Sequence, residues 1–420
     1  MYFTFIGIIL ARPGSYKTVI LNLLRQWYCI FYTDNFSRKA FQSHMMGATE
    51  EVLNKIDMLP KIKNKHFLTP ELAPIFTTDG EELLASLGII TRIADGHGLA
   101  TDSGTHGHRE YGDTMFVWTG AAVDVPYKVY KLLGNLGFKI YFFRLPYAEK
   151  NEDELLEDTR RTFDQKKSNI ESALYDYLGW FEIGPNLIYD EQSDLPKMRW
   201  DYDREYSDND NGNNNKQSLR WIVKLAQLLA HLRRTAQTWT PEGDDQGQGS
   251  DYGFSVTQPE DPRRAIEVLK SLARGHALSM GRNFITLEDI PIVVKTVLST
   301  AIIDRVGLLR LLIAKNGTLV TSEIMDALKV ARKTALRTMK ELWAVGLIDM
   351  KDDTSIVYTK RIILKEEFQW LLNEDFQKLL EGFEPVDNRA FMKAPKVLPA
   401  DKQASANKCR TIDSGSLVER

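Results

Sequence analysis

The most constraining feature of the sequence is a short loop between an apolar run and the start of a helical pattern. The run Phe3 to Leu10 predicts a buried strand, and residues 11–18 contain a Pro-Gly turn and end in Lys17-Thr18. A phosphate-binding loop has the pattern Gly-x-x-x-x-Gly-Lys-Ser/Thr, whose glycines let backbone N–H groups turn inward around phosphates. Residues 11–18 match the lysine and hydroxyl positions of that pattern.

The glycine positions of the pattern are altered. Ala11 and Tyr16 occupy them, and Gly14 is the only glycine inside the loop. The motif alone leaves two interpretations open: a phosphate site, or a strand followed by a Pro-Gly turn and a helix N-terminus. If the loop binds a nucleotide, the candidate contact residues are Pro13, Gly14, Ser15, Tyr16, Lys17 and Thr18.

Composition limits the classes of function. The 420 residues leave room for two or three domains, and 54 Lys and Arg against 57 Asp and Glu exclude a uniformly basic nucleic-acid coat. Cys29 and Cys409 lie far apart in unlike contexts, which favours a reducing, cytoplasmic location over a disulfide framework. Apolar stretches fall short of the roughly 20 residues of a membrane helix, so no membrane partner is expected. A strand that begins almost at Met1 leads us to expect a truncated or misassigned N-terminus.

A second apolar run ends in a single acidic residue. His66 to Leu72 predicts a strand, with Pro70 and Glu71 where a phosphate-hydrolysing site places an acidic pair. In such a site the first acid holds Mg²⁺ and the second polarises the attacking water. Pro70 removes the metal-binding acid, so Glu71 is the candidate water-activating residue and Mg²⁺ would depend on Thr18 and the nucleotide, with Thr69 as a further candidate. The alternative for Glu71 is a helix N-terminal acid after Pro70.

Strands and helices alternate as far as residue 146. A helical pattern over 19–32 and another over 81–94 are followed by apolar runs at 114–119 and 138–146 that predict further strands. This alternation predicts an α/β fold with a parallel sheet flanked by helices.

The glycine-rich segment 95–109 predicts a projecting hairpin. Its three histidines, His97, His106 and His108, lack the spacing of a zinc framework. A solvated or DNA-facing loop is therefore the better interpretation of this segment.

The order of these parts over residues 1–300 resembles an AAA+ ATPase core. It is most similar to the branch with an insert in its second helix, which contains the minichromosome-maintenance helicases and the enhancer-binding transcription activators. The resemblance rests on the 11–18 loop, the strand ending in Glu71, the 95–109 hairpin, the strand 115–118 and a run 131–146 that ends in Arg-Leu-Pro. It implies ATP and Mg²⁺ as cofactors, a homo-oligomeric ring and a P-loop core over residues 1–205.

The resemblance also assigns roles to residues outside the loop. It implies that Glu71 activates water and that Thr18 binds the metal. Thr119 would be the sensor that follows the strand 115–118, and Arg144 ends the core. Residues 206–300, with polar low-complexity loops at 207–216 and 241–253, resemble the helical lid of such proteins. One lid arginine usually reaches the γ-phosphate, and Arg264 is the candidate, with Arg263 as the alternative.

Residues 301–381 carry the strongest local pattern in the chain. A helix, a Gly317 break, a short helix, a third helix over 332–345, a charged turn at 351–353 and a strand at 356–359 predict a winged helix-turn-helix. On the third helix Lys333, Arg337 and Lys340 share a face away from the apolar stripe, which favours DNA binding. A winged helix that docks a protein is the alternative.

The function predicted from these parts is an ATP-binding, slowly hydrolysing, DNA-associated switch or motor. Slow turnover is expected because Pro70 and Tyr16 replace a metal-binding acid and a loop glycine. The alternatives are a non-catalytic DNA-binding regulator that uses a degenerate AAA+ core as an oligomerisation scaffold, and a protein-interaction module. The polar tail at 382–420 is expected to be disordered.

Overall fold

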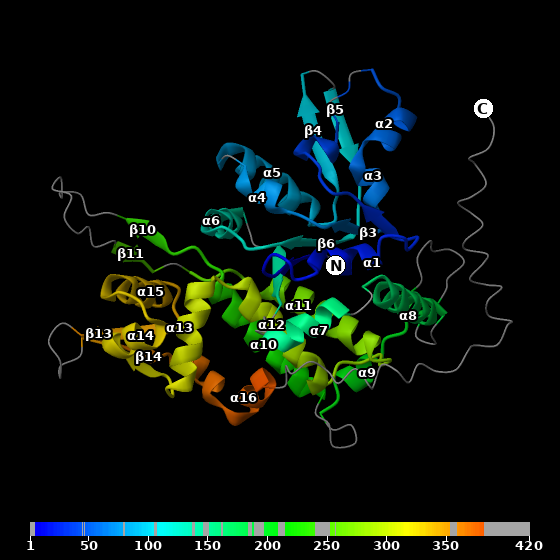
Figure 1. The fold of residues 1–420 in the computed structure, drawn as a ribbon. Helices are drawn as coiled ribbons and strands as arrows, with labels where there is room; N and C mark the ends of the chain where they lie inside the picture. The colour runs from blue at the N-terminus through cyan, green and yellow to red at the C-terminus, as the bar shows by residue number, and fades with distance from the viewer. Residues whose placement is uncertain are drawn as a thin grey trace.

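The computed structural model of the chain (Figure 1) shows an α/β protein with a five-stranded parallel sheet flanked by helices. This confirms the fold class predicted from the alternation of strands and helices. The tail at 382–420 and most of the two polar loops lie outside the described residues. The structure describes residues 5–43, 45, 47–78, 80–104, 107–136, 139–145, 151–160, 163–183, 187–188, 197–208, 215–239, 253–256, 258–352 and 359–381.

All five strands of the sheet run in the same direction. Their order across the sheet is β2-β3-β6-β1-β7, so the first strand of the chain lies inside the sheet, between β6 and β7. Burial on both faces explains why these segments read as apolar runs in the sequence. The bounds are β1 Phe5–Leu10, β2 Ile30–Tyr32, β3 His66–Thr69, β6 Val117–Ala122 and β7 Ile140–Arg144.

The connecting helices lie on opposite faces of the sheet. α1 (Lys17–Leu23) follows β1, leads toward the edge strand β2, and packs on one face through Leu21. α5 (Gly80–Ile93) and α6 (Tyr127–Leu136) connect strands in the reverse direction and pack on the other face (Figure 1). Right-handed crossovers require this change of face when the direction across the sheet reverses. The sheet therefore has a topological switch point between β1 and β6.

The α5 face of the sheet also carries four short elements and the predicted hairpin. The hairpin pairs β4 (Leu99–Ser103) with β5 (Gly107–Tyr111) in antiparallel register, which confirms the prediction for 95–109. It projects beyond the sheet beside α2 and α3 (Figure 1). The short elements are η1 Arg38–Ala40, α2 Glu50–Ile56, α3 Met58–Ile62 and α4 Ala73–Thr77.

A buried carboxylate ties the hairpin to α3. Asp57 accepts bonds from Arg109 Nη2 at 2.5 Å and from Tyr111 OH at 2.7 Å. Burial alone would raise the pKa of Asp57, but the bonds from Tyr111 and Ser43 and the charge of Arg109 hold that pKa below its usual value. The same burial and the same carboxylate raise the pKa of Tyr111 to about 12. The projecting hairpin is therefore fixed at its base.

Three long helices cover the α1 face beside β7. They are α10 (Asn215–Leu232), α11 (Arg263–Ser279) and α12 (Ile290–Thr300). α12 lies along the free edge of β7, where Thr300 Oγ1 accepts a bond from Phe142 N at 3.0 Å. That contact satisfies a backbone donor which an edge strand otherwise leaves open.

The C-terminal unit, residues 301–381, combines helices with a small antiparallel sheet of order β12-β14-β13. Its buried residues form one apolar cluster with those of α10, α11 and α12, so the two regions share a core. The strand predicted at 356–359 lies mostly outside the described residues. The bounds are α13 Ile303–Ala314, β12 Thr318–Val320, α14 Thr321–Leu328, α15 Arg332–Ala344, β13 Ile348–Asp352, β14 Lys360–Leu364, η3 Glu366–Leu372 and α16 Glu374–Glu381.

The remaining elements all lie between β7 and α12 in the chain. α8 packs against α1, where Trp27 and Tyr175 stack with ring centroids 5.5 Å apart. No helix in the described part of the chain is both long and apolar enough to cross a membrane. The bounds are α7 Glu152–Arg160, α8 Phe163–Ile183, β8 Leu187–Ile188, β9 Lys197–Met198, α9 Tyr202–Glu205, β10 Gln237–Trp239, β11 Gly253–Ser255 and η2 Leu287–Asp289.

Two elements differ from their predicted bounds. The helical pattern over 19–32 extends past the end of α1 at Leu23, where the backbone turns. The strand predicted at 114–119 begins at Val117, because Thr114 is bound to the hairpin base through Gly96 O at 2.8 Å. The second shift moves Thr119 from the end of its strand to the middle.

Candidate functional site

The 11–18 loop leaves β1 at the carboxyl end of the sheet and enters α1. Ser15 N closes a turn on Arg12 O at 3.3 Å. Two loop residues have a left-handed backbone, Gly14 with φ 76° and Tyr16 with φ 61°. Tyr16 occupies the second glycine position of the phosphate-binding pattern. The backbone there has the conformation that glycine adopts readily, although the side chain is tyrosine.

Lys17 is the buried cation of the loop. It is 7% exposed, and its Nζ donates to Ala11 O at 2.7 Å and to Arg12 O at 2.9 Å, with Ser15 Oγ 3.4 Å away. These acceptors are neutral, and the described residues supply no carboxylate partner to Lys17. A buried ammonium without an anion is costly, so an anionic ligand at this loop would be stabilised by a charge already held in place.

The first turn of α1 adds donors beside Lys17. The first backbone bond of the helix runs from Ile20 N to Tyr16 O at 2.9 Å, so the amides of residues 17–19 precede the regular ladder. No side chain caps this helix end, and Thr18 is exposed on it. Uncapped amides and a hydroxyl at a helix N-terminus are suited to an anion.

Glu71 follows β3 at the same end of the sheet. Its side chain is exposed, and Oε1 accepts a bond from Ala73 N at 2.9 Å at the start of α4. Glu71 thus acts as an acid at a helix N-terminus, which is the alternative role considered for it from the sequence. Its second carboxylate oxygen has no partner among the described residues. Thr69 is fully buried and accepts a bond from Trp118 Nε1 at 3.2 Å, so it faces the core.

Arg144 ends β7 next to the loop. It pairs in register with Leu10, the residue that precedes the loop, and Leu145 N donates to Leu10 O at 2.9 Å. Its Nη2 lies 3.0 Å from Oδ1 of Asp124, which follows β6. Sequence reasoning missed Asp124, although its place directly after a strand was a usable signal. The carboxyl end of the sheet therefore gathers the loop, Glu71, Asp124 and Arg144.

Thr119 lies away from this end. It is in the middle of β6, where its Oγ1 is 2.8 Å from Nε2 of His66. Burial lowers the pKa of His66 to about 4, so the ring is neutral at pH 7 and Thr119 is a hydrogen-bond partner of an uncharged imidazole. The strand ends three residues later at Ala122, and Thr119 is therefore not part of the group around the loop.

Arg264 lies at the opposite end of the sheet from the loop. It pairs with Asp95, which also accepts a bond from Lys139 Nζ at 2.6 Å, and Lys139 immediately precedes β7. Burial alone would raise the pKa of Asp95, but the bonds from Lys139 and Arg264 keep that pKa below its usual value. The length of β7, about 17 Å at 3.3 Å per residue, separates this cluster from the loop end. In this conformation Arg264 is a partner of Asp95, and the loop is out of its reach.

The described residues assemble no group of three or more His, Cys, Asp or Glu side chains suited to a metal ion. The hairpin histidines pair separately: His97 Nδ1 is 3.4 Å from Asp113, and His108 Nδ1 is 2.9 Å from Asp102. His106 lies outside the described residues. Among the described residues, Thr18 is therefore the candidate protein ligand for Mg²⁺, and no cluster of carboxylates is assembled there for the metal.

The three predicted DNA-binding residues lie on α15 but differ in surroundings. Lys333 is exposed, Arg337 is exposed with Asp304 at 3.7 Å and Glu341 at 3.8 Å, and Lys340 is half-buried. Ion pairs of that length on an exposed side chain are weak, so Arg337 remains able to contact another anion.

A buried arginine that sequence reasoning missed holds α15 in place. Arg305 is fully buried, donates to Leu232 O at 3.0 Å and to Arg234 O, and lies 3.4 Å from Glu341. It joins the end of α10 to α13 and α15. Only the long-range fold brings these groups together, and no local signal in the sequence indicates them.

No protein-family model matches the chain, and no curated protein matches it. The carboxyl end of the sheet has a buried cation, uncapped helix amides, an exposed hydroxyl and a carboxylate with one oxygen still available. This combination can bind an anion and orient a water molecule beside it.

Proposed function

We propose that the chain binds the phosphate groups of ATP at the 11–18 loop. The observation that carries the proposal is Lys17, a buried ammonium held by neutral loop oxygens at the junction of β1 and α1. The β- and γ-phosphates of a nucleotide would supply the missing anion, and the amides of the first turn of α1 would donate to the same group.

The position of the loop in the sheet supports the proposal. Ligands of open parallel sheets bind outside the carboxyl ends of the strands, at the switch point where connections leave to opposite faces. Here that point lies between β1 and β6, directly beside the loop. The parallel sheet with helices on both faces is also what the AAA+ resemblance implies for residues 1–205.

Hydrolysis would depend on Glu71 and on a metal held mainly by the nucleotide. Glu71 would orient the attacking water, but one of its oxygens caps α4 and Pro70 supplies no acid for Mg²⁺. The metal would be carried by the phosphates, with Thr18 as its protein ligand. We expect the nucleotide to bind tightly and to be hydrolysed slowly. Such a site is better suited to a nucleotide-driven switch than to a fast motor.

A nucleotide titration tests the binding proposal. Lys17→Ala should weaken binding of a fluorescent ATP analogue about 30-fold, since a charge-assisted contact is worth about 2 kcal/mol. Because Lys17 also supports the loop, Thr18→Val is the second variant: it should keep binding in EDTA and lose the gain produced by Mg²⁺. Lys65→Ala, an exposed lysine at the amino end of the sheet, should bind as the unmodified chain does. Equal affinity for the analogue in the Lys17 and Lys65 variants would refute the proposal.

A second proposal concerns the C-terminal unit. The order α13, β12, α14, α15, β13, β14 and the antiparallel sheet β12-β14-β13 support a winged helix-turn-helix over residues 301–381. Its third helix, α15, carries exposed basic residues near its start, Arg332, Lys333 and Arg337. We propose that this helix contacts DNA, with Lys340 flanking the contact, and that α10 to α12 act as a lid over the core.

Salt-dependent DNA binding tests the second proposal. Replacing Lys333, Arg337 and Lys340 with Ala should lower the slope of log affinity against log salt by about 3, one unit for each lost phosphate contact. A control with Ala at 61, 63 and 65 removes the same charge from a distant surface and should leave the slope unchanged. An unchanged slope in the first variant would favour protein docking by this helix.

The competing function is a non-catalytic regulator whose core is an oligomerisation scaffold. It predicts ATP binding without phosphate release, and a mass by light scattering that does not depend on nucleotide. Release of phosphate that is stimulated by duplex DNA and lost in Glu71→Gln would favour the switch or motor.

A further inference from the structure

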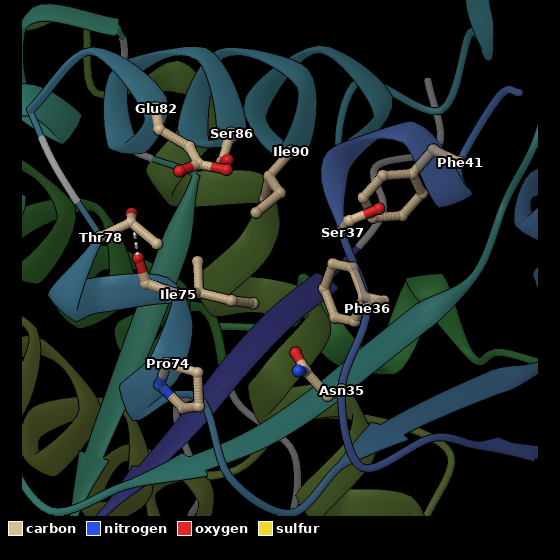
Figure 2. A pocket seen from close by; sticks show the side chains of 10 residues that line it. All are labelled: Asn35, Phe36, Ser37, Phe41, Pro74, Ile75, Thr78, Glu82, Ser86 and Ile90. Carbon is tan, nitrogen blue, oxygen red and sulfur yellow. Dashed lines mark hydrogen bonds between the residues drawn. The ribbon is translucent and has the colours of Figure 1, made fainter. Parts of the chain in front are cut away.

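A cleft on the α5 face of the sheet has the features of a second ligand site. It has a volume of about 190 Å³ and lies between the segment after β2 and the helices α4 and α5 (Figure 2). Residues after β2 form one wall, and Pro74 to Ile90 of α4 and α5 form the other. α1 and the 11–18 loop belong to the opposite face, so the cleft is separate from the proposed phosphate site.

One wall of the cleft is a preformed aromatic surface. The Phe36 ring lies 5.2 Å from that of Phe41, 5.5 Å from that of Phe67 and 5.5 Å from that of Trp118, all between centroids. Phe41, Phe67 and Trp118 are buried, which fixes the ring of Phe36 at the mouth of the cluster. Ile75 and Ile90 complete the apolar lining in Figure 2. A ring can therefore stack here without reordering the wall.

Polar groups converge on this surface without being used by the fold. The side chains of Asn35, Ser37, Glu82 and Ser86 line the cleft, and none of them makes a hydrogen bond or ion pair within the described chain. Thr78 differs, because its Oγ1 donates to Ile75 O at 2.9 Å. Glu82 is the only charged residue among the described residues that line the cleft, so its carboxylate is the group there that would hold a cation.

Size restricts the ligand further. A cavity of about 150 Å³ holds one benzene ring. The volume of the cleft leaves room for such a ring and for a chain of two or three further atoms. A two-ring or nucleotide-sized ligand therefore does not fit inside it. We propose that the cleft binds a small organic cation consisting of one aromatic ring and a short ammonium arm, with the ring on Phe36 and the ammonium on Glu82.

The test compares three probes, each with one aromatic ring and a short polar arm, by ligand-observed NMR titration of the full chain. 2-Phenylethylamine carries the ring and the ammonium, 2-phenylethanol is neutral, and 3-phenylpropionate is anionic. We expect the amine to bind about tenfold more tightly than the alcohol, since a charge-assisted bond replaces a neutral one. Equal binding of the amine and the anion, or no saturable binding of any probe, would overturn the proposal.

Two variants on α5 locate the binding. Glu82→Gln should bring the affinity for the amine down to that for the alcohol, while Glu81→Gln, one residue earlier and outside the cleft lining, should leave the tenfold preference intact. Ser86→Leu fills the cleft and should abolish binding of the amine and the alcohol alike. Thermal melting confirms that each variant is folded. If Glu82→Gln kept the preference, the proposal would be wrong, whatever the outcome at the 11–18 loop.

Discussion

The two ends of the parallel sheet treat their charged groups in opposite ways. At the amino end, Asp95 lies between Lys139 and Arg264, and all three side chains are mostly buried. At the carboxyl end, Lys17 contacts only neutral oxygens of its own loop, and the Arg144 pair with Asp124 is largely open to solvent. At the amino end each of the three charged side chains has a charged partner, whereas the carboxyl end holds cations that an anion can reach.

This difference indicates which end serves stability and which serves binding. Paired, buried charges fix elements that are distant in sequence, and here they attach α11 to the end of α5 and the start of β7. Unpaired cations next to helix amides lower stability unless a ligand arrives. Arg264 was predicted to reach a phosphate at the carboxyl end of the sheet. It instead pairs with Asp95 at the amino end, where the paired charges stabilise the fold.

The largest effect is expected from removing the carboxylate of Asp95, which tests whether the amino-end cluster stabilises the fold. Asp95→Asn should lower the free energy of unfolding by about 3 kcal/mol, because it leaves Lys139 and Arg264 without an anion in a mostly buried site. Urea denaturation at pH 7 measures the loss. The matched change at the other end, Asp124→Asn, removes an exposed partner of Arg144 and should cost about 0.5 kcal/mol or less.

Equal losses in the two variants would contradict the proposed division of the sheet. A further control is nucleotide affinity, which Asp95→Asn should leave unchanged in the folded protein. If ATP binding fell with Asp95→Asn, the amino-end cluster would be coupled to the loop, and the role predicted for Arg264 from the AAA+ resemblance would regain support.

The second prediction concerns His66, the first residue of β3. Its pKa is about 4 when folded and about 6.5 when unfolded, so only the unfolded chain takes up a proton between those values. Folding stability therefore falls as pH decreases from 6.5 and levels off below 4. Between pH 7 and pH 5 the contribution is about 2 kcal/mol.

His66→Gln should remove this part of the pH dependence, since glutamine does not titrate and can still meet Thr119 Oγ1. Denaturation curves at several pH values between 7 and 5 give the measurement. His97→Gln, which changes an exposed histidine of the hairpin segment, should leave the curve of the unmodified chain in place. If His66→Gln left the pH dependence between 7 and 5 unchanged, His66 would take up its proton equally in the folded and the unfolded chain, and the remaining slope would come from other groups such as the half-buried His231.

Local sequence patterns predicted those elements whose signal lies within one short stretch of the chain. The run before the loop became β1, the 95–109 segment became the hairpin, and the third helix of the C-terminal unit agrees with α15 to within one residue. The signal was a continuous apolar run for β1, glycines at turn positions for the hairpin and apolar residues at helical spacing for α15.

The misses involve contacts between distant segments. Trp27 continues the helical spacing of α1 but packs on Tyr175 of α8, so an apolar residue at the expected position does not lie on a helix. Thr119 was misplaced because the register of β6 depends on a bond between Thr114 and Gly96 at the hairpin base. Arg264 and Asp95 are 169 residues apart, and no local pattern encodes that pair.

The smallest predicted effect sharpens the interpretation of the loop. Tyr16 is 59% exposed and has a left-handed backbone, which costs a residue with a side chain about 1 to 2 kcal/mol. Tyr16→Gly removes that strain, and the greater freedom of glycine in the unfolded chain offsets part of the gain. We expect the free energy of unfolding to rise by about 0.5 kcal/mol, measured by urea denaturation without nucleotide.

The control for this change is Tyr28→Gly, at a similarly exposed tyrosine whose φ is not positive. There glycine relieves no strain, so the same substitution should lower stability by about 1 kcal/mol. Opposite signs at the two tyrosines would mean that the loop keeps a glycine conformation against the preference of its own residue. Destabilisation at both would mean instead that the Tyr16 side chain stabilises the loop, and the altered glycine position would then count against a phosphate site.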